Sequence, residues 1–241
     1  MSHAADLSKS PGKISAMFDA IAPRYDFLNH VLSAGIDRRW RTRAIRSLRL
    51  TGRERVLDVC TGTADLAIAA RTATPGAARV VGVDFAGAML ELGRDKIANA
   101  GLAPEVTLVR GDAVRIPAAD SSVDAVTVAF GIRNVEDVPA ACREMYRVLK
   151  GGGALAILEF AIPTVPILRT AYLMYFRHIL PAIGRLVSRH SAAYEYLPDS
   201  VGSFATPDQL MGTLRACGFV DVAAVRMTFG IVFLYTARRG S

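Results

Sequence analysis

Residues 55–66, RVLDVCTGTADL, decide the fold of this 241-residue chain. Residues 55–60 are apolar except for Arg55 and Asp58, which predicts a short buried strand. A turn of small residues follows, and residues 64–71 have the apolar spacing of a helix. Such a turn lets backbone N–H groups and a helix N-terminus approach a ligand closely. Taken alone this turn is a weak signal, because Thr61 and Ala64 stand where glycines would be expected.

The alternation of strand and helix continues on the C-terminal side of this segment. Further strands are expected at 79–84, 106–110, 125–129 and 154–160, and helices at about 86–100 and 140–149. Short connections between them favour a parallel sheet covered on both faces.

The last forty residues follow a different pattern. A helix is expected at 207–217, ended by Gly218, and two extended runs at 220–227 and 231–238 flank Thr228-Phe229-Gly230. A connection this short makes the last two strands antiparallel. The predicted fold class is α/β: a seven-stranded, Rossmann-like sheet with an antiparallel C-terminal hairpin, a topology that resembles the class I methyltransferase sheet by analogy of fold alone. A nicotinamide dehydrogenase is disfavoured, because the first turn lacks the G-x-G-x-x-G pattern.

Composition indicates one globular domain over residues 1–241. The chain is 51% hydrophobic and 21% charged, so it can bury a sizeable core and is not a disordered protein. We expect a mobile arm at 1–12, an N-terminal helical cap at 13–50 and a helical lid or substrate insertion at 162–205. Three scattered cysteines predict neither a disulfide framework nor structural zinc. We found no signal-peptide pattern and no membrane-spanning run, so we expect a cytoplasmic protein.

The net charge of +7 is concentrated in two segments. Residues 37–49, DRRWRTRAIRSLR, contain six arginines and one acid, and no acid lies between Glu159 and Glu195. Such surfaces attract nucleic acid, anionic lipid or an acidic ligand, although a solvated basic face is an equal alternative.

Three acids follow three successive predicted strands: Asp58, Asp84 and Asp112. The carboxyl ends of parallel strands share one sheet edge, where open α/β folds bind ligands. Asp58 could face the ammonium of a methionine moiety, and Asp84 could accept hydrogen bonds from both ribose hydroxyls. Asp112 and the Ala113 N–H could bind adenine. Each acid alone is more commonly a helix cap or turn residue.

With these residues placed, the chain resembles the demethylmenaquinone and ubiquinone-precursor C-methyltransferases of quinone biosynthesis. The resemblance spans about residues 13–238. It rests on four motifs in order: the run YDFLNHVLS at 25–33 through Trp40, FGIRN at 130–134, RVLKGGG at 147–153 continuing to Glu159, and YLPDSV at 196–201.

The resemblance implies S-adenosylmethionine as methyl donor and a reduced prenylated quinone as acceptor. The family's cofactor residues correspond to Thr63, Asp84, Asp112 and Ala113, beside which we place Asp58 and Gly62 from the strand-end argument. This sequence departs from the family pattern at Ala129, where some members have serine, and at Asp37, Gly151 and Ala161. At Ala129 one side-chain hydrogen bond to the cofactor is absent or is supplied by another group, and the other departures put the branch of the family in doubt.

C-methylation needs a ring carbon made nucleophilic by loss of a phenolic proton. The resemblance places Arg133 and Asn134 at the reaction centre, and Tyr25 could close over it. An arginine base is physically awkward, because guanidinium keeps its proton far above neutral pH. We therefore expect Arg133 to act as a fixed cation that lowers the phenol pKa, with Asn134 orienting a water or the second ring oxygen. A structural salt bridge from Arg133 to Glu136 or Asp137 is the alternative.

Residues 167–187 mix apolar and aromatic side chains with arginines. We expect a cationic, amphipathic cover over the substrate entrance that makes transient contact with an anionic membrane surface. A plain lid or a homodimer face are the alternatives. Two other functions stay open: methylation of another aromatic small molecule, and nucleic-acid binding by the arginines of 37–49, against which no recognised RNA motif is present.

Overall fold

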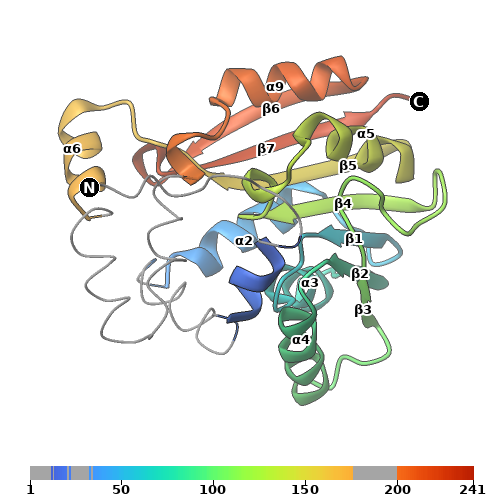
Figure 1. Cartoon of the computed structure of the whole chain (residues 1–241). Coiled ribbons are helices and arrows are strands. Elements are labelled where there is room, and N and C mark those ends of the chain that lie inside the picture. Colours follow the sequence, from blue (N-terminus) through green and yellow to red (C-terminus); the bar gives the residue numbers. More distant parts are fainter. Residues whose placement is uncertain (1–11, 13, 21, 23–32, 34, 176–199) are drawn as a thin grey trace.

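The computed structural model describes residues 12, 14–20, 22, 33, 35–175 and 200–241 (Figure 1). Tyr25 and the part of the predicted cover from 176 to 187 lie outside these residues, as do most of the YDFLNHVLS and YLPDSV motifs. The predictions made for them therefore stay predictions. Within the described residues, no helix is long and apolar enough to cross a membrane.

A seven-stranded sheet organises the molecule in the order β3-β2-β1-β4-β5-β7-β6. Its strands are β1 (Arg55–Val59), β2 (Arg79–Asp84), β3 (Val106–Arg110), β4 (Val123–Ala129), β5 (Leu149–Phe160), β6 (Phe219–Met227) and β7 (Val232–Arg239). The first five strands pair in parallel, and β7 pairs antiparallel with both β5 and β6. The predicted fold class is thereby confirmed.

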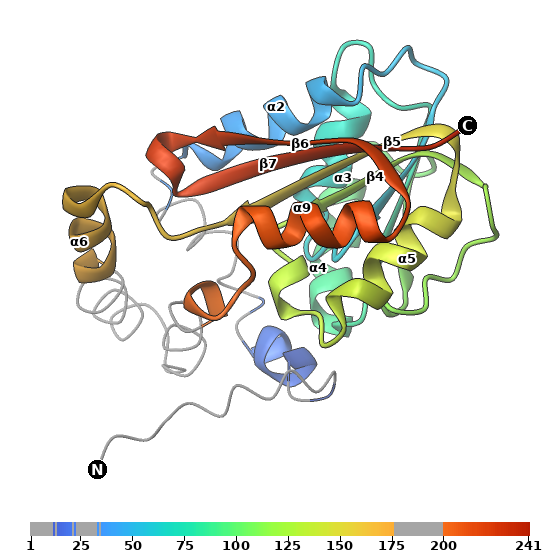
Figure 2. The same cartoon turned by 90° about the horizontal axis from the view of Figure 1, so that it is seen from above.

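Helices cover both faces of the sheet (Figure 2). On one face lie α2 (Asp37–Ser47), α3 (Asp65–Thr72) and α4 (Gly87–Asn99), which contribute Trp40, Leu66 and Ile97 to one apolar cluster. On the other face lie α5 (Val138–Val148) and α9 (Pro207–Ala216), with Met145 and Leu214 in a second cluster. Because these helices cover the faces of the sheet, the ends of the strands and the loops that follow them stay accessible to a ligand.

Two predicted strands begin earlier than expected. β4 begins at Val123 and β5 at Leu149, because these two residues already pair with each other before a register shift. The run Gly151-Gly152-Gly153 concealed this pairing, since glycines weaken a strand pattern. The C-terminal hairpin is as predicted, with a 3-10 turn η3 (Thr228–Gly230) between β6 and β7.

The expected cap and lid are described in part. Residues 14–20 are helical and α2 is a full helix, while α6 (Pro166–Met174) begins the predicted lid. In Figure 1, α6 lies at the end of the molecule beyond the β6–β7 turn.

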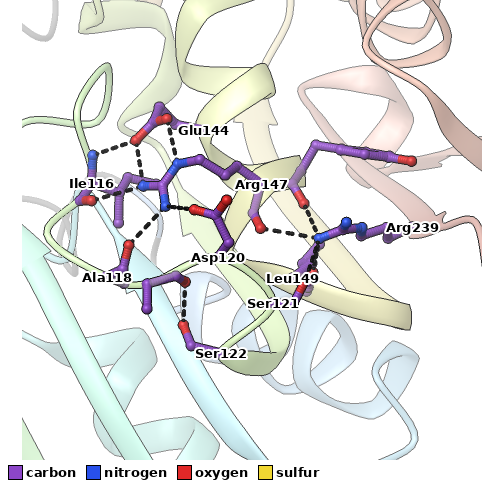
Figure 3. A network of polar contacts seen from close by, with 11 residues as sticks. Ile116, Ala118, Asp120, Ser121, Ser122, Glu144, Arg147, Leu149 and Arg239 are labelled. Atoms are coloured by element: carbon purple, nitrogen blue, oxygen red, sulfur yellow. Dashed lines mark hydrogen bonds and ion pairs between the residues drawn. The ribbon is translucent and has the colours of Figure 1, made fainter.

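An arginine network holds the loop that follows β3 (Figure 3). Arg147, near the end of α5, donates to Glu144 and Asp120 and to the carbonyls of Ala118 and Ile116. Glu144 accepts in turn from the Ile116 N–H at 2.8 Å. This part of the RVLKGGG motif is thus structural: it fixes the loop that begins with Asp112 and Ala113.

Candidate active site

The turn after β1 has the backbone of a glycine-rich loop although it contains one glycine. Gly62 and Ala64 have φ of 54° and 67°, in the left-handed region that favours glycine. The Ala64 N–H donates to the Thr61 carbonyl at 2.9 Å, and α3 starts at the next residue. The alanine at 64 therefore weakened the sequence signal without changing the fold of the loop.

Asp58 lies beneath this turn, with 1% of its surface exposed. The hydroxyls of Thr61 and Thr127 donate to its two carboxylate oxygens at 2.6 and 2.7 Å. Burial raises the pKa of Asp58 from 3.8 to about 6, although both hydroxyls act to lower it. The carboxylate ties the turn to β4, and its contact with an ammonium stays a prediction.

Asp84, at the end of β2, accepts two backbone hydrogen bonds. The Gly62 N–H donates to Oδ2 at 2.8 Å and the Ala86 N–H donates to Oδ1 at 2.9 Å. Each oxygen keeps a second lone pair, so the carboxylate can still accept from a ligand hydroxyl. Burial raises the pKa of Asp84, while these backbone donors lower it. Asp84 thereby couples the turn after β1 to the start of α4.

Thr63 is buried behind the same turn and accepts from Lys96 Nζ at 3.3 Å. Lys96 also bonds Asp65, the first residue of α3. Thr63 therefore connects α4 to the turn, and its contact with a cofactor stays a prediction.

Two small adjoining cavities, together called here the groove, lie above the strand ends. One, of about 40 Å³, is lined by residues that include Gly62, Asp84 and Ala129; the other, of about 120 Å³, includes Asp112 and Ala113. Phe85 and Asn134 line both, so the cavities adjoin. Asp112 uses Oδ1 to accept from the Val114 N–H at 3.1 Å, which forms a turn around Ala113.

Asn134 faces this groove with an unused acceptor. Its side chain is 6% exposed, and Oδ1 has no hydrogen-bond partner among the described residues. A buried acceptor without a donor is unfavourable by about 1–3 kcal/mol. The arrangement therefore calls for a donor from a ligand or a bound water at this point.

The turns after β1 and β4 touch each other. A Cβ added at Gly131 would lie 2.3 Å from the Cys60 Cβ, so no other residue fits there without a shift. Cys60 and Phe130, on either side of this contact, both have positive φ. The close contact places the FGIRN motif directly beside the cofactor turn.

Arg133 forms a buried ion pair with Glu159. Its Nη1 lies 2.8 Å from Glu159 Oε1, its backbone N–H donates to Oε2 at 3.2 Å, and the exposed fractions are 5% and 0%. Nη1 also donates to the Phe130 carbonyl and Nε to Ser200 Oγ. The expected alternative of a salt bridge with Glu136 or Asp137 is wrong, because the guanidinium points to the end of β5.

An aromatic wall adjoins this pair. Phe130 and Phe160 stack with ring centroids 4.4 Å apart, and Trp40 meets both rings edge-on at about 6 Å. The Arg133 Cζ lies 5.5 Å from the Phe160 ring centroid. The three rings thus form an apolar wall beside a fixed positive charge.

Two further elements contribute residues near the site, and sequence reasoning missed these residues. Tyr172 of α6 is 8% exposed; burial raises the pKa of its phenol, and Arg133 and Glu159 both act on it electrostatically. Phe18, from helical segment 14–20, lines the smaller cavity, and its neighbour Asp19 accepts from the Ala88 N–H at 2.9 Å. Asp19 thus caps the N-terminal turn of α4, which holds the segment over the groove.

The structure brings together Gly62, Thr63, Asp84, Asp112, Ala113, Arg133 and Asn134, with Asp58 underneath. No group of three or more metal-ligating side chains is found among the residues that the structure describes. The prediction that no metal takes part stays untested.

Comparison with known proteins agrees with this geometry. The model of the ubiE/COQ5 methyltransferase family matches residues 7–239. A ubiquinone/menaquinone biosynthesis C-methyltransferase of Geobacter sp. (strain M21) is 47% identical over 233 residues, which are 97% of this chain and 99% of that protein. A demethylmenaquinone methyltransferase of Bacteroides fragilis is 40% identical over 232 residues, 96% of this chain and 94% of that protein.

Among solved structures, a SAM-dependent methyltransferase of Thermotoga maritima superposes with a TM-score of 0.62 at 17% identity, covering 92% of this chain and 99% of the other. At this identity the likeness concerns the fold alone.

Proposed function

The chain belongs to the ubiE/COQ5 methyltransferase family, and from this we propose that it methylates a ring carbon of a reduced prenylated quinone precursor, using S-adenosylmethionine. The preferred reaction is demethylmenaquinol to menaquinol, with the benzoquinol of ubiquinone synthesis as a second acceptor. One observation carries the proposal: the near full-length match to relatives that are named for these reactions.

The groove fits the methyl donor. When bound, S-adenosylmethionine supplies an electrophilic methyl group on a sulfonium. Asp84 would accept from its ribose hydroxyls, Asp112 and the Ala113 N–H would hold the adenine, and Gly62 with Thr63 would line the methionine end. Asp58 adds negative charge beneath the turn, which favours a cationic ligand.

The acceptor side is built from the residues around the aromatic wall. Phe130 and Phe160 would hold the ring, and Arg133 would stabilise the phenolate that forms when the hydroxyl loses its proton. Glu159 fixes the guanidinium in place and compensates part of its charge, so that a buried cation is tolerated. Asn134 Oδ1 would accept a hydrogen bond from the ring hydroxyl or from the water that takes the proton. Either bond would satisfy this acceptor, which has no partner among the described residues.

The remaining proposals concern place and assembly. A prenylated acceptor resides in a bilayer, so the protein would meet it at the cytoplasmic face as a peripheral protein. Tyr25 as a closing group, residues 162–205 as a helical lid or substrate insertion, and a homodimer also stay proposals.

The test is a transfer assay with purified full-length protein, S-adenosylmethionine and two reduced acceptors, a short-chain demethylmenaquinol and a ubiquinone precursor. Mass spectrometry should find one added methyl in at least one product. No methyl on either acceptor, with cofactor binding shown by calorimetry, would instead support the hypothesis that another aromatic compound is the substrate.

A further inference from the structure

A broad groove lies on the sheet face opposite α5 and α9, between α2 and the C-terminal hairpin. Its volume is about 1470 Å³, and the residues that line it include seven arginines and a single acid, Asp221. The groove forms because α2 packs against β5 and β7, while none of the described helices lies over β6 on this side (Figure 2). It is separate from the two cavities of the cofactor groove.

Three arginines of α2 have no counter-charge among the residues that the structure describes. Arg39, Arg43 and Arg46 are exposed and follow one another at helical spacing, and none forms an ion pair with a described residue. Arg41 on the same helix differs, since it pairs with Asp37 and Asp65. Like charges at this spacing disfavour the helix, so the stripe is best explained by an anion outside the chain.

Apolar side chains protrude at the end of this groove. Phe229, at the tip of the β6–β7 turn, is 72% exposed and has φ of 58°, a conformation that strains a bulky residue. Val165 and Ile167, on the chain entering α6, are 41% and 82% exposed. The two elements are neighbours, because the Ala161 N–H donates to the Ile231 carbonyl at 2.9 Å, and Figure 1 shows α6 at this same end.

The groove is also joined to the acceptor side of the active site. Trp40 of α2 donates from Nε1 to Thr228 Oγ1 of the turn at 2.8 Å and touches Phe130 and Phe160. Val232, two residues after Gly230, pairs with Phe160 at the end of β5. A ligand held at the turn would therefore lie near the aromatic wall.

We propose that this surface, formed by Arg38, Arg39, Arg43, Arg46, Arg226 and Phe229 and called here the arginine face, docks on an anionic phospholipid bilayer. The guanidinium groups meet lipid phosphates while Phe229 enters the interfacial region. The inference rests on the proposed function, since a prenylated acceptor is presented by a membrane. An RNA is less well matched: the other aromatic ring lining the groove, Trp40, is 5% exposed and offers no base a stacking surface.

The test is flotation of full-length protein with phosphatidylcholine vesicles, with and without phosphatidylglycerol. Each arginine near an anionic surface contributes about a fivefold factor, so Arg39→Gln/Arg43→Gln/Arg46→Gln should weaken binding on the order of 100-fold. The matched control is Arg79→Gln/Arg94→Gln/Arg143→Gln, three exposed arginines on other elements with the same change in net charge. The control should bind nearly as well as the unchanged protein.

A second variant reports on the apolar tip. Phe229→Trp adds one indole to a chain whose only tryptophan, Trp40, is buried. The fluorescence of the added indole should shift to shorter wavelength with phosphatidylglycerol vesicles and should not shift with phosphatidylcholine alone. Equal loss of binding in the two arginine triples, or an indole emission that shifts with neither kind of vesicle, would overturn the proposal.

Two controls separate this proposal from others. If the α2 triple loses binding to a single-stranded RNA while keeping vesicle binding, the arginine face is a nucleic-acid surface and the proposal is overturned. Turnover of a water-soluble short-chain acceptor without vesicles should be unchanged in the α2 triple. Vesicle binding by a protein that methylates neither acceptor would contradict the proposed function and leave the arginine face standing.

Discussion

Asp58 and Asp84 are two buried carboxyl groups that accept hydrogen bonds from the turn after β1. Both are buried and both have raised pKa values, that of Asp58 reaching about 6. The charges acting on Asp58 include Asp84, which raises its pKa, and Arg41, which lowers it. A cationic ligand beside them would favour their ionised forms.

Cofactor affinity should therefore depend on pH. As pH falls through about 6, the Asp58 carboxyl takes up a proton, and calorimetry should show the affinity for S-adenosylmethionine weakening by up to about tenfold per unit. Asp58→Asn should flatten this profile. A dissociation constant that is equal at about pH 5 and pH 7.5 in the unchanged protein would contradict the assignment.

The stability of the ligand-free protein should change in the opposite direction. Because the folded pKa of Asp58 lies above the ordinary 3.8, its contribution is fully present below about pH 4 and is lost as pH rises through 6. A difference of about two units corresponds to about 3 kcal/mol. Urea unfolding of the unchanged protein and of Asp58→Asn across this range would measure it.

Variants of Arg133 and Glu159 can distinguish the proposed catalytic role of the guanidinium from its role in stabilising the fold. Arg133→Gln should retain cofactor affinity and lower turnover by on the order of 10²–10³, the usual loss for one preorganised charge contact. It should also destabilise the fold by about 3–5 kcal/mol, because Glu159 is left buried and unpaired.

The double variant Arg133→Gln/Glu159→Gln distinguishes the effect on turnover from the effect on the free energy of unfolding. It removes the unpaired charge, so the free energy of unfolding should recover while turnover stays low. Recovery of turnover together with stability would show that the pair only supports the fold.

At the scale of elements, the site depends on two turns that touch. The turn after β1 and the turn after β4 meet at Cys60 and Gly131, and Asp58 ties the same two strands through Thr127. Their spacing sets the distance between the cofactor groove and the FGIRN motif.

Gly131→Ala should therefore weaken cofactor binding and lower the free energy of unfolding by about 1–3 kcal/mol, because the added methyl overlaps the Cys60 Cβ. Gly212→Ala in α9 is the control, since nothing lies within 4 Å of its added methyl. Calorimetry and urea unfolding of both variants check this. Gly131→Ala behaving like the control would mean that the turns are free to separate.

Sequence patterns predicted most helices and strands, and they predicted that the strand-end acids lie at one edge of the sheet. They could do so because hydrophobic periodicity and turn residues are local properties of the sequence. They could not reveal that Arg133 pairs with Glu159, because Glu159 lies 26 residues further along the chain, on β5. They also missed Tyr172 and Phe18, whose positions depend on how α6 and segment 14–20 pack over the sheet. Asp58 was predicted at the right edge, yet its burial beneath Thr61 became evident only from the structure.

At the scale of the whole molecule, one sheet edge gathers the cofactor turn, the Arg133–Glu159 pair and the aromatic wall. The C-terminal hairpin adds β7 beside β5 and carries its turn to this same edge. The arginine face begins where that turn meets α2. The fold thus brings the proposed methyl-donor site, the proposed acceptor site and the proposed membrane contact to one end of the protein.

The most direct test of this account is to find the atom that receives the methyl group. Purified protein is supplied with S-adenosylmethionine labelled with ¹³C in its methyl group and with reduced short-chain demethylmenaquinol, and the product is analysed by NMR. We predict that the label lies on a ring carbon of a menaquinol. Label on a ring oxygen, or an unlabelled quinol despite bound cofactor, would contradict the account.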